Sequence, residues 1–373
     1  MAGIYLHIPF CKQACTYCNF HFSTSLKTKD ELVRALAREA KEEKEYVGQE
    51  TINTIYFGGG TPSILDESDI EFLLTTLFRY YQISLDAEIT LEANPDDIST
   101  QKLNTWKQLG INRLSIGVQS FFENELIWMN RAHNAEQSIN NLELARKVFD
   151  NITIDLIYAS PILSDEMWKQ NVEQAFKLCI PHLSCYALTV EEKTPLHKLI
   201  KTHKAPDVQN ETQARQFLLL MQWLREKGYE HYEVSNFAKP GFRSRHNSSY
   251  WEGEKYLGLG PSAHSYNGIE RRWNVANNNL YIKSINENSL QRETETLTLT
   301  QRLNEYIMIS LRTMEGMDLK KVIEQFGTKE QERIQKNVQK FITQGLVKKD
   351  NLILQLTDEG MLRADGIASE LFA

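Results

Sequence analysis

Residues 3–18, GIYLHIPFCKQACTYC, join a short apolar run to three closely spaced cysteines. Gly3–Ile8 alternates in the manner of a β-strand, and Pro9 makes a turn after it. Cys11, Cys15 and Cys18 then follow with three and two residues between them. Three thiols on one loop after a strand are typical of a metal or cluster site, and they decide how the rest of the chain is interpreted.

The cysteine spacing favours an iron–sulfur cluster. Iron–sulfur clusters are held by soft thiolate ligands, and cysteines on one loop can reach three corners of a single cube. Three ligands leave the fourth iron open, and the amino and carboxylate groups of S-adenosylmethionine can chelate it. We therefore predict a [4Fe–4S] cluster with S-adenosylmethionine on Cys11, Cys15 and Cys18.

A zinc site is the alternative for the same cysteines. Zinc takes four nitrogen or sulfur ligands, and His7 or His21 would complete the set. Zinc sites of this kind usually occur in small, loop-rich modules, whereas this loop opens a long chain of alternating strands and helices. Metal analysis separates the two interpretations.

Six strand-like runs alternate with segments of helical length. The strands are expected at Gly3–Ile8, Ile52–Phe57, Ala87–Ala93, Arg113–Val118, Ile152–Ala159 and His182–Leu188. The helices are expected at Lys29–Val47, Glu67–Tyr80, Thr100–Leu109, Ala135–Val148, Glu166–Leu178 and Glu211–Lys227. The pattern Thr28-x-x-Glu31 predicts a capping box for the first helix. Such alternation predicts an α/β fold with a parallel sheet. Six units fit either a partial barrel or a doubly wound sheet, and the expected fold is a partial (β/α)6 barrel.

The rest of the chain does not continue this alternation of strands and helices. Residues 229–293 are aromatic, rich in Asn and turns, and without a clear period. Two helical patterns, a hairpin near Leu346–Leu356 and a last helix from Asp358 follow, which outlines a winged-helix-like module. The expected organisation is a barrel over 1–228, a connecting region over 229–293 and the C-terminal module over 294–373.

Charge and composition exclude several classes of function. The net charge is −7, and residues 292–373 hold 12 basic and 13 acidic side chains, which is a poor surface for phosphates. No nucleic-acid partner is therefore expected. No apolar run reaches the ~20 residues that a bilayer requires, and no signal peptide is visible, so the expected location is the cytoplasm. Cys179 and Cys185, the other two cysteines, are expected to be buried.

Polar side chains stand at or beyond the ends of consecutive strands. Enzymes built on barrels place their sites at this face. The glycine-rich segment 58–62, GGGTP, follows the second strand, where the missing Cβ atoms let the backbone approach a ligand. The polar residues at or beyond the ends of the next three strands are Glu92, Gln119, Arg131 and Asp155. Tyr5 and Tyr17 are candidate aromatic contacts for a cofactor.

The segment from Tyr5 to Cys18 resembles the radical-SAM family of oxygen-independent coproporphyrinogen III oxidases and their haem-chaperone relatives of the HemW type. The resemblance extends over nearly the whole chain. It implies that Gly59, Gly60 and Thr61 meet the amino end of S-adenosylmethionine. It also implies that Glu92 binds the ribose, and that Gln119, Arg131 and Asp155 line the same pocket.

Two departures favour the chaperone branch over the oxidases. The oxidases carry a further cysteine two residues after the third, where this chain has Phe20, and they have an extension before the first strand. Residues 246–251, HNSSYW, match the His-Asn-x-x-Tyr-Trp motif that is associated with haem binding in the chaperones. The resemblance therefore implies that His246 is an iron ligand or close haem contact, since a neutral imidazole suits haem iron.

The function expected from this resemblance is that of a haem chaperone, with no catalytic residue assigned. It would pass haem to acceptor haemoproteins, with respiratory membrane enzymes among the candidates; the sequence sets no oligomeric state. The alternative is an oxygen-independent coproporphyrinogen III oxidase or another radical-SAM oxidoreductase of porphyrin metabolism. A third interpretation is a zinc-stabilised binding protein with a nucleic-acid module. Metal analysis would test it.

Overall fold

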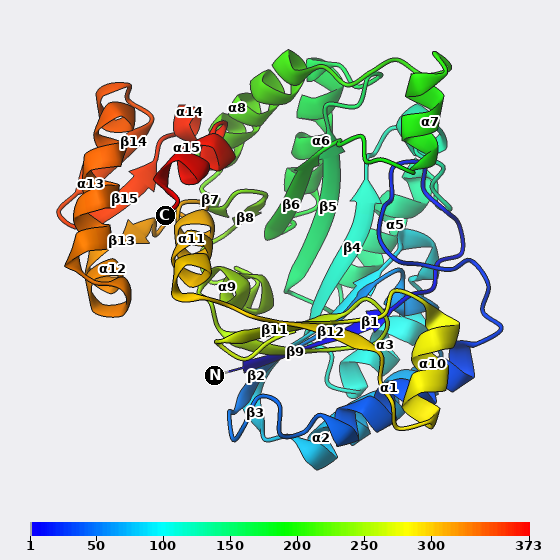
Figure 1. Cartoon of the computed structure of the whole chain (residues 1–373). Coiled ribbons are helices and arrows are strands. Elements are labelled where there is room, and N and C mark those ends of the chain that lie inside the picture. The colour runs from blue at the N-terminus through cyan, green and yellow to red at the C-terminus, as the bar shows by residue number, and fades with distance from the viewer. Residues whose placement is uncertain (1) are drawn as a thin grey trace.

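A computed structural model describes residues 2–373. Twelve strands form one curved sheet in the order β12-β11-β10-β9-β1-β2-β3-β4-β5-β6-β8-β7. A separate three-stranded sheet, β13-β15-β14, belongs to the C-terminal part of the chain. Figure 1 shows this second sheet and its helices beside the large sheet. The fold is thus the expected α/β class with a parallel core.

The six expected strand–helix units are present and pair in sequence order. Their parallel pairing continues from β1 to β6, with register shifts in three of the five strand pairs. The elements are β1 (Ala2–Ile8), α1 (Lys29–Glu42), β2 (Ile52–Gly59), α2 (Glu67–Tyr80), β3 (Ile83–Ala93), α3 (Thr100–Gln108), β4 (Arg113–Gln119), α5 (Ala135–Arg146), β5 (Ile152–Tyr158), α6 (Asp165–Lys177), β6 (His182–Ala187) and α8 (Asn210–Glu226). The short helices α4 (Glu123–Trp128) and α7 (Pro195–Lys201) were not expected.

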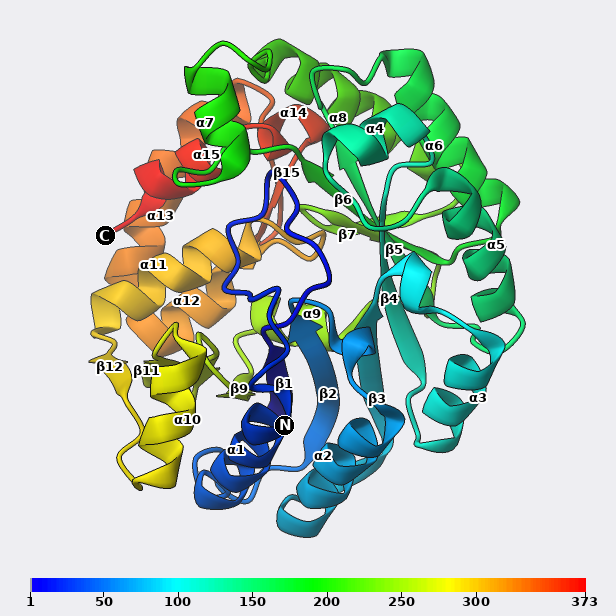
Figure 2. The ribbon, with the colours of Figure 1, turned by 90° about the vertical axis from the view of Figure 1, so that its right-hand side faces the viewer.

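The strands alternate between an apolar and a polar face. Ile4, Leu6, Phe57 and Leu183 are fully buried in the main hydrophobic core. Helix α1 packs on this face through an apolar stripe that includes Leu36. In Figure 2 the helices α1, α2, α3, α5 and α6 lie around the outside of the strands. Apolar burial of this kind is the main force that holds a sheet to its helices, and it directs the polar strand positions inward.

Residues 229–293, expected to lack a regular pattern, extend the sheet at both of its ends. At one end, β7 (Glu230–Glu233) and β8 (Asn236–Ala238) form a hairpin that pairs with β6. At the other end, β9 (Lys255–Leu259) pairs parallel to β1 and continues the barrel. The remaining elements are α9 (Arg245–Trp251), β10 (His264–Tyr266), β11 (Glu270–Asn274), α10 (Asn278–Asn286) and β12 (Arg292–Thr296). These strands are too short to show a periodic pattern in sequence.

Two local expectations were wrong. Helix α1 begins after Thr28, but the Thr28 side chain makes no capping hydrogen bond, so the expected capping box is absent. Cys179 is exposed rather than buried, because it lies in the turn after α6 with a φ of 53°. Cys185, on β6, is buried as expected.

The C-terminal module has its own hydrophobic core, with Ile307, Leu319, Val338 and Leu371 among its members. The expected helices and hairpin are present. The elements are α11 (Leu299–Ser310), β13 (Met317–Asp318), α12 (Leu319–Phe326), α13 (Thr328–Thr343), β14 (Val347–Asp350), β15 (Ile353–Leu356), α14 (Asp358–Met361) and α15 (Ala364–Leu371). The arrangement of helices over a small antiparallel sheet agrees with the expected winged-helix outline.

Candidate functional site

The cysteine loop connects β1 to α1 and lies across the ends of the parallel strands, as Figure 2 shows. Backbone hydrogen bonds hold it in place from several sides. The amide of Cys11 donates to the Ser23 carbonyl at 3.0 Å, and the amide of Thr16 donates to the Met129 carbonyl at 3.1 Å. The Thr16 carbonyl accepts from the amide of Leu196 at 2.9 Å. The loop is therefore fixed by its neighbours.

Two of the three thiols accept hydrogen bonds from polar side chains. The Thr61 hydroxyl donates to the Sγ of Cys11 at 3.6 Å, and the Arg131 guanidinium donates to the Sγ of Cys15 at 3.1 Å. Burial raises the pKa of Cys11 to about 11, and it raises the pKa of Cys18 as well. A thiol with a raised pKa stays protonated at neutral pH unless a cation takes the place of its proton.

The zinc alternative needs four ligands that converge on one ion. Among residues 2–373, no three Cys, His, Asp or Glu side chains converge on one metal-ion position. A cubane spreads its iron corners apart, whereas a zinc ion needs all its ligands at about 2.0–2.3 Å. The two candidate histidine ligands are also engaged, because His7 Nε2 contacts the His21 carbonyl at 3.0 Å and His21 Nε2 contacts Asn278 at 2.7 Å. These contacts disfavour the zinc alternative.

Arg131 and Asn94 connect the predicted site residues. The guanidinium of Arg131 donates to Oδ1 of Asn94 and to the Gly117 carbonyl, both at 2.8 Å. Asn94 in turn donates to the Thr61 hydroxyl at 3.3 Å. A continuous path of hydrogen bonds therefore runs from Cys11 to Cys15. Asn94 was not predicted as a site residue, although its position between the end of a strand and Pro95 could have indicated it.

Two buried polar atoms of the predicted site residues lack a partner. These are Oε1 of Gln119 and Nε of Arg131, which make no hydrogen bond within residues 2–373. Gln119 also adopts a φ of 63°, a left-handed conformation that non-glycine residues rarely take. Unpaired buried polar atoms and backbone strain are costly, and they gather where a ligand supplies the missing contacts. Both residues therefore fit a polar cofactor.

The glycine-rich loop after β2 packs against β1 and the cysteine loop. Gly59 has a φ of 109°, and a Cβ atom there would lie 2.7 Å from the His7 ring. A Cβ atom on Gly60 would lie 2.6 Å from the Phe10 carbonyl oxygen. The amide of Gly60 donates to the Ile8 carbonyl at 2.8 Å. Larger residues would push this loop away from the cysteines, which explains why glycines stand here.

Glu92 and Asp155 are acidic side chains on the inner face of β3 and β5. Burial raises the pKa of Glu92 to about 7, against hydrogen bonds from the Tyr56 hydroxyl at 2.8 Å and the Gly59 amide at 3.2 Å. Burial likewise raises the pKa of Asp155 to about 6, against a hydrogen bond from Ser184. Carboxyl groups whose pKa lies near these values can accept hydrogen bonds from hydroxyl groups such as those of ribose.

The two candidate aromatics lie at different depths. Tyr5, on β1, stacks on Tyr56 with ring centroids 6.1 Å apart, and its hydroxyl contacts Nδ1 of His7 at 3.1 Å. Tyr17 lies within the cysteine loop and packs in a small apolar cluster with Met129 and Leu196. The structure thus places Tyr5 on the inner face of the barrel and Tyr17 behind the cysteines.

His246 lies on α9, beneath the inner face of the sheet, and is 2% exposed. Its Nδ1 contacts the Thr54 hydroxyl at 2.8 Å, and its Nε2 contacts the Tyr250 hydroxyl at 3.0 Å. Its ring stacks on Tyr56 at 4.9 Å. The role of His246 as an iron ligand stays a prediction, and ligation would require one of these hydrogen bonds to break.

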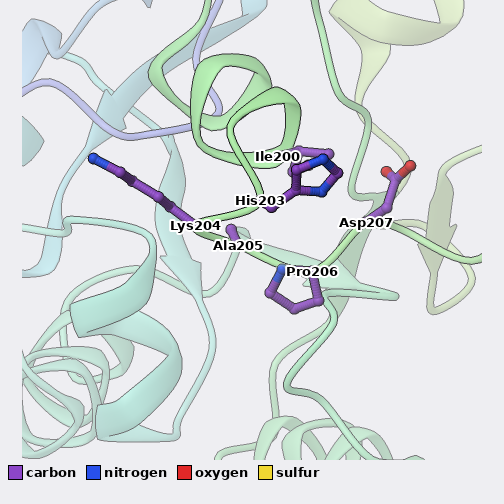
Figure 3. A pocket seen from close by; sticks show the side chains of 6 residues that line it. All are labelled: Ile200, His203, Lys204, Ala205, Pro206 and Asp207. Atoms are coloured by element: carbon purple, nitrogen blue, oxygen red, sulfur yellow. The ribbon is translucent and has the colours of Figure 1, made fainter.

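A surface hollow of about 450 Å³ lies elsewhere, at the end of α7. Ile200, His203, Lys204, Ala205, Pro206 and Asp207 line it, as Figure 3 shows. It contains none of the predicted site residues. We therefore assign the candidate site to the cysteine loop and the strand ends.

Comparisons with known proteins agree with this geometry. Residues 5–175 match the radical SAM superfamily, and residues 297–363 match the HemN C-terminal domain. The chain is 33% identical over 366 residues to the haem chaperone HemW of Bacillus subtilis, covering 97% of each chain. It is 33% identical over 357 residues to the haem chaperone HemW of Lactococcus lactis, covering 95% of this chain and 93% of the relative.

A solved structure has the same fold. The coproporphyrinogen III oxidase HemN from Escherichia coli, described as a radical SAM enzyme, superposes with a TM-score of 0.86. The identity is 24%, over all of this chain and 90% of that one. No helix within residues 2–373 has the length and apolar character needed to cross a membrane.

Proposed function

The chain belongs to the haem chaperone HemW family of radical-SAM proteins, and from that premise we propose that it binds haem and delivers it to acceptor haemoproteins. The observation that carries the proposal is the fixed loop of three thiols at the strand ends, with Arg131 and Thr61 against the sulfur atoms. This arrangement supports the proposal of a cluster held by three cysteines. The match extends over nearly the whole chain, so it includes the region beyond the barrel.

Cys11, Cys15 and Cys18 would hold a [4Fe–4S] cluster. When bound, this cluster supplies one-electron chemistry and an open iron for S-adenosylmethionine. Arg131 places a positive charge next to Cys15 and donates a hydrogen bond to its sulfur atom. Asn94 keeps Arg131 in position through its 2.8 Å hydrogen bond. The protein's own contribution is thus to orient the thiolates and to compensate their charge.

The surrounding side chains would bind S-adenosylmethionine. Gly59, Gly60 and Thr61 bring the backbone toward its amino end, and Glu92 offers a carboxylate to the ribose hydroxyls. Gln119 and Arg131 each have an unpaired buried atom that a polar ligand would satisfy. Asp155, Tyr5 and Tyr17 complete the proposed set.

The oxidase is the second candidate function, because HemN shares the fold. At 24% identity that likeness supports the fold alone. The haem chaperones are more similar in sequence, and this chain has an exposed Phe20 where the oxidases have a further cysteine. The chaperone proposal is therefore preferred.

The first test is the cofactor content. Protein purified and reconstituted without oxygen should contain about four iron and four sulfide per chain and show the broad absorption of a [4Fe–4S] cluster. The Cys15→Ala variant should lose this cluster, whereas Cys185→Ala, on a buried cysteine away from the site, should keep it. Stoichiometric zinc without iron or sulfide would contradict the proposal.

The second test is haem transfer. Haemin titrated into the reconstituted protein should give a saturable Soret band, and the loaded protein should transfer haem to an apo-haemoprotein. A parallel incubation with reductant, S-adenosylmethionine and coproporphyrinogen III should yield no protoporphyrinogen. Accumulation of that product would replace the chaperone by the oxidase.

The acceptors and the compartment also belong to the proposal. We propose delivery in the cytoplasm, with respiratory enzymes at the membrane among the acceptors. Affinity capture with haem-loaded and haem-free protein should enrich haemoproteins only in the loaded state. Equal capture in both states would contradict haem-dependent delivery.

A further inference from the structure

Tyr56, on β2, lies between the proposed cofactor pocket and helix α9. Its hydroxyl donates to Oε1 of Glu92 at 2.8 Å. Its ring stacks on the His246 imidazole, with ring centroids 4.9 Å apart and an interplanar angle of 23°. Tyr56 therefore contacts a residue of the cofactor pocket with its polar end and a residue of the α9 motif with its flat face.

The two strands that carry these residues explain the placement of Tyr56. Side chains two residues apart on a strand point to the same face, so Thr54 and Tyr56 both point to the inside of the barrel. Thr54 is buried and contacts Nδ1 of His246 at 2.8 Å, whereas Tyr56 is only partly buried. On β3, Glu88 is buried, and Glu92, four residues later, is partly exposed. The inside of the barrel is thus closed beside α9 and open toward the strand ends, and Tyr56 lies at the boundary.

Helix α9 is attached to the same part of the sheet, which fixes its contact with Tyr56. The Glu88 carboxylate accepts hydrogen bonds from the amides of Arg245 and His246, each at 3.0 Å. These amides belong to the first turn of α9, where backbone donors have no partner within the helix. The Nε of Arg113 lies 3.8 Å from Oε2 of Glu88, and both side chains are buried. The carboxylate and its counter-charge therefore hold His246 against Tyr56.

The close approach of Tyr56 to Glu92 depends on a glycine. A Cβ atom on Gly58 would lie 2.8 Å from the Tyr56 ring and 3.1 Å from Oε1 of Glu92. A side chain at this position would push the two groups apart. The other carboxylate oxygen of Glu92 accepts from the Gly59 amide at 3.2 Å. Two donors, one from a side chain and one from the glycine-rich loop, therefore set the orientation of Glu92.

We propose that Tyr56 is a positioning residue for both parts of the site: its hydroxyl orients the Glu92 carboxylate for S-adenosylmethionine, and its ring supports the His246 imidazole of the α9 motif. The inference rests on the proposed function and names one residue that both binding regions share. Tyrosine combines a hydrogen-bond donor with a flat aromatic face. Phenylalanine would keep the face without the donor, and leucine would keep neither, so the two roles can be tested separately.

The Tyr56 hydroxyl also affects the charge of Glu92. Burial is the main cause that raises the pKa of Glu92 to about 7, and the charge of Asp155 acts in the same direction, whereas the hydrogen bond from Tyr56 opposes both. The titratable groups that face Glu92 are Tyr5 from β1, Tyr56 from β2, Asp155 from β5 and Tyr186 from β6. Loss of the Tyr56 hydroxyl should therefore raise the pKa of Glu92, so that its carboxylate forms only at higher pH.

The Tyr56→Phe variant of the reconstituted full-length protein tests the hydroxyl. Its affinity for S-adenosylmethionine, measured by equilibrium dialysis at neutral pH, should fall about tenfold, because Glu92 loses a charge-assisted hydrogen bond. When the dialysis is repeated between about pH 6 and pH 9, the rise of affinity with pH should occur at higher pH than in the wild type. A general loosening of the fold would not shift this pH dependence.

Tyr81→Phe is the matched control for the lost hydroxyl. The buried Tyr81 hydroxyl donates to the Ala40 carbonyl at 2.7 Å, between α1 and the end of α2. The variant should bind S-adenosylmethionine as the wild type does. Urea denaturation of the metal-free variants shows whether each of them folds.

A haemin titration tests the aromatic face. Tyr56→Phe should keep the wild-type affinity and Soret band, because its ring still supports the imidazole. Tyr56→Leu should weaken haemin binding and change the Soret band, so that phenylalanine restores what leucine removes. The titration thus separates the ring from the hydroxyl.

Two results would overturn the inference. One is a wild-type affinity and pH dependence for S-adenosylmethionine in Tyr56→Phe, and the other is a wild-type haemin spectrum in folded Tyr56→Leu. If the wild-type protein binds no haemin, the proposed chaperone function fails instead. The dialysis with Tyr56→Phe still decides the role of the hydroxyl in that case.

Discussion

Replacing Arg131 by lysine should remove most of the hydrogen bonds through which Arg131 connects the cysteine loop to the ends of the strands. The Arg131 guanidinium uses two nitrogens, one toward Cys15 at 3.1 Å and one toward Asn94 and the Gly117 carbonyl at 2.8 Å. Lysine keeps the charge but ends in a single nitrogen on a thinner stem. It can therefore serve one side of this arrangement and must leave the other unpaired.

The size of the effect follows from the hydrogen bonds that are lost. A hydrogen bond to a charged group contributes about 1.5–3 kcal/mol. Losing one or two of the three contacts should lower the free energy of unfolding by about 2–5 kcal/mol, which is a large part of the 5–15 kcal/mol that stabilises a typical protein. The same change leaves the Asn94 amide and the Cys15 thiolate without their shared partner, so cluster content and cofactor affinity should fall together.

Urea denaturation of the metal-free protein, followed by far-ultraviolet circular dichroism, measures the first effect. Iron and sulfide analysis after anaerobic reconstitution, with equilibrium dialysis of S-adenosylmethionine, measures the second. Arg34→Lys, on the exposed side of α1, is the matched control and should change neither. Wild-type stability, iron content and cofactor affinity in Arg131→Lys would refute the assigned role of Arg131.

Three further changes test other parts of the structure. Gly60→Ala should abolish cofactor binding in equilibrium dialysis, because its Cβ atom would lie 2.6 Å from the Phe10 carbonyl oxygen. Thr61→Val should retain the fold but yield less cluster per chain on iron analysis, since the hydroxyl contact to Cys11 is lost. The pKa of Glu39 is raised by burial from 4.5 to about 7, so the folded state binds the extra proton and the free energy of unfolding should fall by about 3 kcal/mol as pH rises from about 4.5 to 7.5. Glu39→Gln should flatten this dependence in urea titrations at several pH values, and an unchanged slope would contradict it.

Much of the site could be predicted because its signals are local in sequence. The cysteine spacing, the glycine-rich loop and the carboxylates at strand ends each stand within a few residues of a periodic strand. Parallel strands bring their carboxyl ends to one edge, so side chains far apart in sequence meet there. Arg131, Thr61, Cys11 and Cys15 are indeed connected by hydrogen bonds through Asn94.

Other features depended on contacts between distant segments. Asn94 bridges Thr61 and Arg131, which no sequence period indicates. The exposure of Cys179 and the engagement of both His246 nitrogens likewise depend on which neighbours surround them. The residue type determines which contacts a side chain can make. Its neighbours in the fold determine which of its atoms remain available for a ligand.

The amino-acid sequence by itself determined the six strand–helix units and the thiol trio, because hydrophobic periodicity and ligand spacing are written within short segments. Only the tertiary structure decided that β9 continues the barrel beside β1 and that β10–β12 extend its inner face. These strands of three to five residues are too short for a periodic pattern, and pairing with strands already in place defines them.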